Sequence, residues 1–324
     1  MFGMRIWLVI GGLWLALAAT PLQAQDYPNR GIKIIVPTPP GGPVDVITRV
    51  VANYLTSSLG QSVVVDNRPG AGNTLGSREA ARADADGYTL LCSSVSGLIL
   101  APMLHKDAGY DPLTSFTHIV AIGTGSLILV VHPSVPANTV QELVAYAKAN
   151  PGKINFSSGG IGVLPHLTGE MFKAAAGIDI VHVPYRGGAP SIQGLVAGNV
   201  QMTFEDTGVL LPLIREGKLR ALAVASPKRS AVLPELPTMI ESGYPAVVSR
   251  SWTGLLAPVG APPAVVTKIN AQVNAGLNSA ELKSLLTKLS VEPLGGTPAD
   301  FVELIKSDLA RWTPVVKSLN LKTN

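Results

Sequence analysis

The feature that most constrains the fold is a strand–loop–helix unit at residues 32–54. Ile34, Ile35 and Val36 form an apolar, β-branched run that is typical of a buried strand. The loop PTPPGGP follows at residues 37–43, and apolar residues then recur at helical spacing to Leu55. A helix that begins after a strand presents free backbone N–H groups and the positive end of its dipole, which favour an anion. The unit therefore indicates either an anion site or a plain strand-to-helix turn.

Residues 1–24 have the pattern of a secretory signal peptide. Arg5 supplies the positive charge, residues 6–19 form the apolar core, and Leu22-Gln23-Ala24 resembles a cleavage site. The apolar run is short for a membrane-spanning helix, although a retained N-terminal anchor is an alternative. We expect cleavage after about Ala24 and export to the periplasm.

Composition excludes several classes of protein. Removing 24 of the 324 residues leaves 300, enough for two lobes, and loss of Arg5 lowers the formal net charge from +4 to +3. This mild charge, without a basic run, argues against a nucleic-acid partner. The single cysteine, Cys92, cannot form an internal disulfide and lies in an apolar run, so we expect a buried, inert thiol.

The remaining chain repeats the alternation of strand and helix, which predicts an α/β fold with loops gathered at the carboxyl ends of the strands. A long β-rich run at residues 119–132 is expected to leave one lobe and enter another. We predict two lobes, each a mixed or parallel sheet flanked by helices. The first combines residues 25–124 with 226–324, and the second spans 125–225.

Two glycine-rich loops share the same design, PTPPGGPVD at residues 37–45 and SSGGIGVLPH at 157–166. Both follow a predicted strand and open a predicted helix. If the lobes face each other, the two helix starts converge on one cleft. Main-chain N–H groups there would hold the carboxylate of a small ligand without an arginine.

Signatures of catalysis are scarce. The sequence lacks G-x-S-x-G, the P-loop motif, H-E-x-x-H and C-x-x-C, and its five histidines show no metal-ligand spacing. We therefore expect no cofactor and no metal. His166 is either a base for Ser157 or Ser158 or, as we prefer, a residue that bonds the loop or bounds the cleft. Asp45 and Asp206 are either helix caps or ligand contacts.

Nine motifs, in order along the mature chain, resemble the Bug-type solute-binding receptors of tripartite tricarboxylate transporters. They are YPNR (27–30), PPGGPVD (39–45), NRPGAG (67–72), DGYTL (86–90), VHPS (131–134), HLTGE (166–170), VPYRG (183–187), GKLRALA (217–223) and GLLAP (254–258).

The resemblance implies a type II periplasmic binding-protein fold that closes like a Venus flytrap over a small carboxylic acid. It also implies a monomer that delivers the acid to a permease of one large and one small subunit. The candidate ligand-binding residues are Thr38, Pro40, Gly41, Gly42, Val44, Asp45, Gly72, Ser94, Ser96, Ser158, Gly160, Gly162, Val163, His166, Tyr185 and Asp206.

Several positions depart from the family pattern. An aromatic residue is usual at Thr38, a hydroxyl residue at Val163 and an asparagine at Asp206. The Pro-Ser that typically follows the hydroxyl residue is Leu164-Pro165 here. The first two changes predict a roomier, less polar pocket that favours an aromatic or branched carboxylate over a compact dicarboxylate. Asp206 would discourage a second carboxylate or welcome an amine, depending on where its side chain points.

Two other functions remain compatible with such a scaffold. One is a secreted hydrolase or transferase, because a fold alone does not exclude chemistry. The other is an orphan receptor that signals to a sensor kinase rather than feeding a permease.

Overall fold

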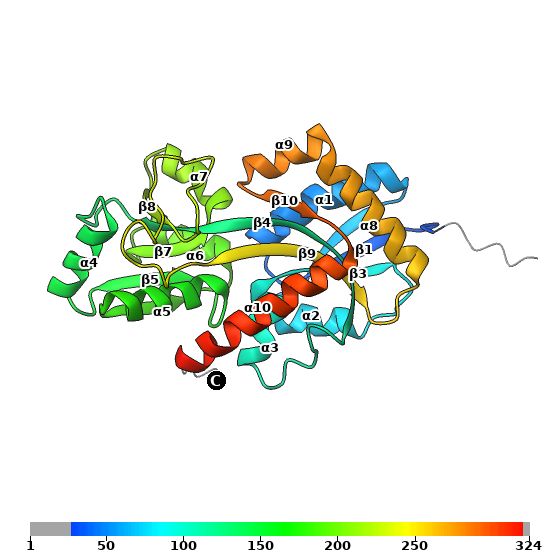
Figure 1. Ribbon diagram of the computed structural model, residues 1–324, viewed down its shortest axis with the longest axis horizontal. Coiled ribbons are helices and arrows are strands. Elements are labelled where there is room, and N and C mark those ends of the chain that lie inside the picture. Colours follow the sequence, from blue (N-terminus) through cyan, green and yellow to red (C-terminus); the bar gives the residue numbers. More distant parts are fainter. Residues whose placement is uncertain (1–26, 320–324) are drawn as a thin grey trace, which may run out of the picture.

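The computed structural model describes residues 27–319, so the predicted signal peptide lies outside the described residues. Two lobes stand side by side, and two long strands run from one to the other (Figure 1). These strands are β4 (Phe116–Val131) and β9 (Arg250–Pro258). The chain crosses to the second lobe along β4 and returns along β9.

The first lobe is built on three parallel strands near the N-terminus, joined by helices. Its elements before the crossing are β1 (Ile32–Val36), α1 (Pro43–Leu59), β2 (Val63–Asn67), η1 (Ala71–Asn73), α2 (Thr74–Ala81), β3 (Thr89–Ser94), η2 (Val95–Leu100) and α3 (Ala101–Leu104). Those after the return are α8 (Pro263–Asn278), α9 (Ala280–Lys288), β10 (Glu292–Gly295) and α10 (Pro298–Leu319).

The second lobe is a continuous stretch of alternating strands and helices. Its elements are α4 (Val140–Ala149), β5 (Ile154–Ser158), α5 (Leu164–Ala176), β6 (Ile180–Pro184), α6 (Gly188–Val196), β7 (Met202–Asp206), α7 (Thr207–Arg215) and β8 (Arg220–Val224). Thr139 caps α4 by accepting a hydrogen bond from the Glu142 N–H.

The strands form one mixed sheet in the order β2-β1-β3-β9-β4-β7-β5-β6, with β8 and β10 also paired to β4. The partner of β4 changes along its length. Residues from Phe116 to Ser126 pair with β9, and residues from Leu127 to Val131 pair with β7. The strand therefore belongs to both lobes, as the β-rich run in the sequence predicted.

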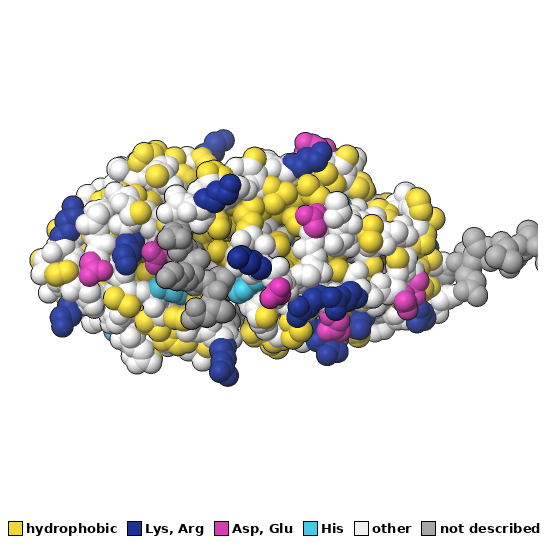
Figure 2. Space-filling model, turned by 90° about the horizontal axis from the view of Figure 1, so that it is seen from below, with side chains coloured by type: hydrophobic (Ala, Val, Ile, Leu, Met, Phe, Trp, Pro, Cys, Tyr) yellow, Lys and Arg dark blue, Asp and Glu magenta, His cyan; other side chains and the backbone are white. Residues whose placement is uncertain are grey.

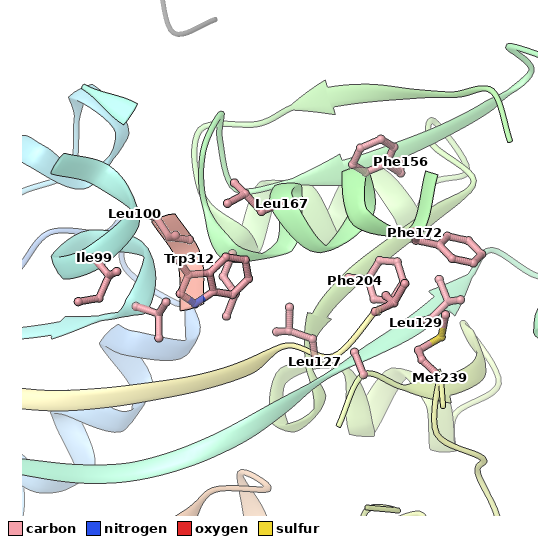
Figure 3. Close-up of a cluster of buried hydrophobic side chains, with 14 of the residues drawn as sticks. Ile99, Leu100, Leu127, Leu129, Phe156, Leu167, Phe172, Phe204, Met239 and Trp312 are labelled. Atoms are coloured by element: carbon pink, nitrogen blue, oxygen red, sulfur yellow. The ribbon is translucent and has the colours of Figure 1, made fainter. Parts of the chain in front are cut away.

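The hydrophobic core also continues from one lobe into the other. In the second lobe, the rings of Phe172 on α5 and Phe204 on β7 pack edge to face, and Leu167 lies on the same helix as Phe172 (Figure 3). The same cluster includes Leu100 of the first lobe and Trp312 of α10. Helix α10 lies along the junction between the lobes (Figure 1) and joins them through these contacts.

Some local features were not predicted from the sequence. The loop after β3 winds into the π-helical segment η2, and the short strand β10 pairs antiparallel with β4. Cys92 is fully buried, as predicted, and burial raises the pKa of its thiol to about 12.

The surface carries its charges in a dispersed arrangement. On the face seen in Figure 2, Lys and Arg side chains lie singly or in small groups, with Asp and Glu between them. Within residues 27–319, no helix has the length and apolar character that a membrane crossing requires.

Candidate functional site

A cavity lies between the two lobes. Its volume is about 90 Å³, which is enough for a few water molecules or a small ligand. Its walls come from the loops that open α1, α5 and α6, the ends of β3 and β7, and the two crossing strands. The lining residues are Thr38, Pro39, Gly42, Pro43, Val44, Ile47, Asn73, Ser94, Val95, Ser96, Gly123, Thr124, Gly125, Gly159, Val163, Leu164, Pro165, Gly187, Gly188, Glu205, Asp206, Ser251, Trp252, Thr253 and Val291.

The first glycine-rich loop opens α1 at the cavity wall. Gly41 adopts φ +80°, a left-handed conformation that favours glycine, and Gly42 precedes the helix without a side-chain cap. The first intrahelical bond runs from Val46 N–H to Gly42 O. The N–H groups of Val44 and Asp45 therefore have no carbonyl partner inside the helix and are available at its start.

Asp45 holds this loop in place from behind. Its carboxylate accepts hydrogen bonds from Gly41 N–H at 2.9 Å and from Asn67 Nδ2 at 2.9 Å, and it pairs with Arg49. Burial opposes the charge, but these bonds outweigh it and lower the pKa of Asp45. Asp45 is 2% exposed and does not line the cavity.

The second glycine-rich loop opens α5 on the opposite lobe. Val163 precedes this helix without a side-chain cap, and Pro165 occupies its first turn. The Leu164 N–H, which has no carbonyl partner inside the helix, donates to Ser96 Oγ at 2.9 Å. Because Ser96 belongs to the first lobe, this bond ties the start of α5 across the cleft.

The lobes also touch through the loop that opens α6. A Cβ placed on Gly187 would lie 2.8 Å from Cγ of Pro39, so the two loops are in close contact. A Cβ placed on Gly188, the next residue, would lie 3.6 Å from Cδ of Pro43. Together with the bond from Leu164 to Ser96, these contacts close the cavity on the side of the loops.

A pair of stacked histidines supports the second loop. Nδ1 of His166 accepts a hydrogen bond from Gly162 N–H at 2.9 Å, and Nε2 of His182 lies 2.7 Å from Ser158 Oγ. The Ser158 hydroxyl also donates to Gly160 O. Both imidazoles are neutral, because burial lowers the pKa of His166 to about 4 and that of His182 to about 3.

The Ser158–His182 contact has the residue types of a nucleophile and its base, but its setting differs from that of a catalytic pair. Ser158 is fully buried, and its hydroxyl is bonded both to Gly160 O in the loop and to His182 on β6. A nucleophile needs access to its substrate. The hydroxyl at Ser158 therefore fixes the shape of the loop. The sequence offered His166 as a base for this serine, but the histidine that contacts Ser158 is His182.

Two neighbouring acids form the wall at the end of β7. Glu205 is 3% exposed, whereas Asp206 is partly exposed and faces the cavity. Burial raises the pKa of both carboxyls, and the charge of Asp206 raises that of Glu205 further. Ser251 of β9 donates a hydrogen bond to Asp206 Oδ1.

Seven of the sixteen predicted site residues line the cavity. They are Thr38, Gly42, Val44, Ser94, Ser96, Val163 and Asp206. The other nine lie beside or behind the wall, within the supporting loops or their neighbours. They are Pro40, Gly41, Asp45, Gly72, Ser158, Gly160, Gly162, His166 and Tyr185.

Sequence reasoning missed the contribution of the crossing strands. Gly125 on β4 and Ser251 and Trp252 on β9 line the cavity. The sequence around Ser251 and Trp252 carries no motif that marks the border of a site. Glu205 was missed as well, although its place beside Asp206 was a usable signal.

Comparisons with known proteins agree with this arrangement. A family model described as the tripartite tricarboxylate transporter family receptor matches residues 47–321. BugT of Bordetella pertussis is 37% identical over 318 residues, which cover 97% of this chain and 98% of BugT.

Solved structures show the same fold. Rpa4515 of R. palustris, determined with adipate, has a TM-score of 0.89 at 34% identity. The match covers 92% of this chain and 99% of the Rpa4515 chain. MatC of Rhodopseudomonas palustris, with bound malate, has a TM-score of 0.85 at 29% identity. The match covers 90% of this chain and all of the MatC chain. The two-lobed α/β architecture is that of a periplasmic binding protein. On the extent of these matches, the chain belongs to the tripartite tricarboxylate transporter receptor family.

Proposed function

We propose that this protein is a periplasmic receptor that captures a small carboxylic acid between its lobes and delivers it to a membrane permease of one large and one small subunit. The observation that carries the proposal is the convergence of two helix starts on one cavity between the lobes, neither of them capped by the side chain of its own preceding residue. The starts of α1 and α5 both lie on its wall. Among the described residues that line it, none is Lys, Arg or His.

A carboxylate in this cavity would be held by main-chain N–H groups. Each charge-assisted hydrogen bond contributes roughly 1.5–3 kcal/mol. Three or four of them, partly offset by desolvation and ordering, support a micromolar affinity of about −8 kcal/mol. Relatives in this family have been determined with adipate and malate. They support an acid as the ligand of this chain.

The walls favour an aromatic or branched acid over a compact dicarboxylate. Apolar side chains line much of the cavity, among them Val44, Val163 and Trp252. The hydroxyl oxygen of Thr38 is buried without a hydrogen-bond partner. We place the apolar part of the ligand against these side chains and one polar atom of the ligand near the Thr38 hydroxyl.

The lobes proposed are residues 25–124 with 226–324, and residues 125–225. The change of strand partner along β4 between Ser126 and Leu127 supports the first boundary. Binding would shift the population towards the closed state, and the permease would recognise the closed surface of both lobes.

Native mass spectrometry of the exported, processed protein tests the function. A small acid that leaves on denaturation supports the receptor and identifies its ligand class. Candidate acids are then incubated with the protein and recovered. A receptor returns them unchanged, whereas chemical turnover would contradict the proposal and favour the hydrolase or transferase alternative.

A further inference from the structure

The end of the cavity at β7 and β9 has a chemistry that a simple dicarboxylate does not match. Here the wall carries two adjacent carboxyl groups, Glu205 and Asp206. None of the described lining residues brings a cationic side chain to balance them. The two carboxyl groups accept hydrogen bonds from neutral donors, the Ser251 hydroxyl and the Asp206 N–H.

The Asp206 carboxylate is open to the cavity because its neighbour on β4 has no side chain. A Cβ placed on Gly125 would lie 3.4 Å from Asp206 Oδ1 and 3.3 Å from Ser251 Oγ. Gly125 itself lines the cavity. Asp206 also lines the cavity, so its carboxylate can be reached from the space where a ligand would lie.

The pair has acceptor capacity that the protein does not use. An ionised carboxylate offers about four lone-pair positions, and a single hydrogen bond, from Ser251, reaches the Asp206 side chain among the contacts of the described residues. Glu205 is the more buried of the two and retains a proton more readily, because burial and the neighbouring charge both raise its pKa. Asp206 then carries the negative charge that faces the cavity.

We infer that the wall formed by Glu205, Asp206 and Ser251 receives a positively charged, hydrogen-bond-donating group, and that the preferred ligand is an aminocarboxylate. This inference rests on the proposed function, in which the helix starts of α1 and α5 hold the carboxylate. The ammonium group at the other end of the ligand donates to Asp206. A second carboxylate in that position meets a like charge and no donor side chain of its own.

Matched pairs of acids test this inference. Isothermal titration calorimetry at pH 7.5 compares 4-aminobutanoate with succinate, 6-aminohexanoate with adipate, and 4-(aminomethyl)benzoate with terephthalate. Hexanoate serves as the acid without a second charge. In the wild-type protein we expect the amino acid of at least one pair to bind tenfold or more tightly than its dicarboxylate and than hexanoate.

Two variants localise the effect. Asp206→Asn keeps the shape of the side chain and removes its charge, so the preference for the amino acid should fall by tenfold or more. Glu205→Gln provides a second test if Asp206→Asn folds poorly, with a smaller loss expected. Asp179→Asn removes one exposed acid of the second lobe that does not line the cavity, and it should leave the preference unchanged.

The outcomes separate the inference from the function on which it rests. Dicarboxylates or hexanoate binding as tightly as the amino acids would overturn the inference and leave the carboxylate receptor standing. A preference for the amino acids that survives in both Asp206→Asn and Glu205→Gln would also overturn it. If no acid of any kind bound, the proposed function would fail together with the inference.

Discussion

The imidazole rings of His166 and His182 lie stacked, with centroids 3.7 Å apart and planes inclined by 16°. Each ring has a hydrogen-bond partner in the loop that precedes α5, Gly162 for the first and Ser158 for the second. His166 is also the first-turn residue of the helix. The pair thus ties strand β6, helix α5 and the loop at the cavity into one unit.

This unit should make the protein sensitive to acid. A histidine has a pKa of about 6.5 in an unfolded chain, and burial lowers the pKa of His166 to about 4 in the folded state. Between these values the unfolded chain binds more protons, so stability falls as the pH falls. His166 should cost up to about 1.4 kcal/mol of unfolding free energy for each pH unit, and the more exposed His182 less.

The measurement is urea unfolding at pH values from 7 to 4. His166→Asn is the matched variant, because the asparagine oxygen can accept the Gly162 N–H while the side chain does not titrate. The difference in unfolding free energy between wild type and variant should shrink or reverse on acidification. A difference that stays constant over this range would contradict the role assigned to the neutral ring.

Ser96 forms a bridge across the cleft that should contribute to ligand affinity. Its Oγ accepts the Leu164 N–H at 2.9 Å, and both residues line the cavity. Ser96→Ala removes the acceptor, and a hydrogen bond of this kind contributes about 0.5–1.5 kcal/mol. We expect the dissociation constant of the identified acid to rise by roughly twofold to tenfold.

Calorimetry on wild type and Ser96→Ala measures this change, and thermal unfolding without ligand checks that the fold is intact. Ser318→Ala, which removes an exposed hydroxyl near the C-terminal end of α10, is the control and should bind as wild type. Equal affinity in Ser96→Ala and wild type would show that the bridge does not contribute to the bound state.

Trp252 should report ligand binding by fluorescence. Trp252 and Trp312 both belong to the core cluster, but only Trp252 also lines the cavity, and its indole N–H donates to Asp308. A ligand that displaces water from the wall changes the surroundings of Trp252. We expect a saturable change in emission that survives in Trp312→Phe and disappears in Trp252→Phe. A signal lost in Trp312→Phe alone would contradict this assignment.

The sequence predicted the frame of this molecule well because its signals are local. Apolar runs ended by glycine and proline marked β1 and β5, and helical spacing marked α1 and α5. The long crossing strand β4, which has 16 residues, was also recognisable from the β-rich run at residues 119–132, since few strands are that long.

The composition of the cavity wall was less accessible to sequence reasoning, because it depends on contacts between distant segments. Asp206 meets Ser251, which is 45 residues away, and Ser96 meets Leu164, which is 68 residues away. No spacing rule connects such pairs. The glycine-rich motifs located the loops, but only the packing distinguishes Gly42 on the wall from Gly41 behind it.

Gly159 is a position where one methyl group should disturb the site. It lines the cavity, and a Cβ there would lie 2.9 Å from Gly188 N and 3.0 Å from Gly187 C. Both atoms belong to the backbone, so neither can move aside as a flexible side chain could. Gly159→Ala should therefore push the loops that open α5 and α6 apart, and overpacking of this kind costs roughly 1–3 kcal/mol.

Gly188→Ala is the matched control, because its added Cβ would meet no atom closer than 3.5 Å. Thermal unfolding should show a melting temperature lowered by a few degrees for Gly159→Ala and nearly unchanged for Gly188→Ala. Because the N–H groups at the start of α5 would shift with the loop, Gly159→Ala should also weaken binding of the acid by tenfold or more. Wild-type stability and affinity in Gly159→Ala would mean that the two loops can separate without cost, and that their close approach does not shape the cavity.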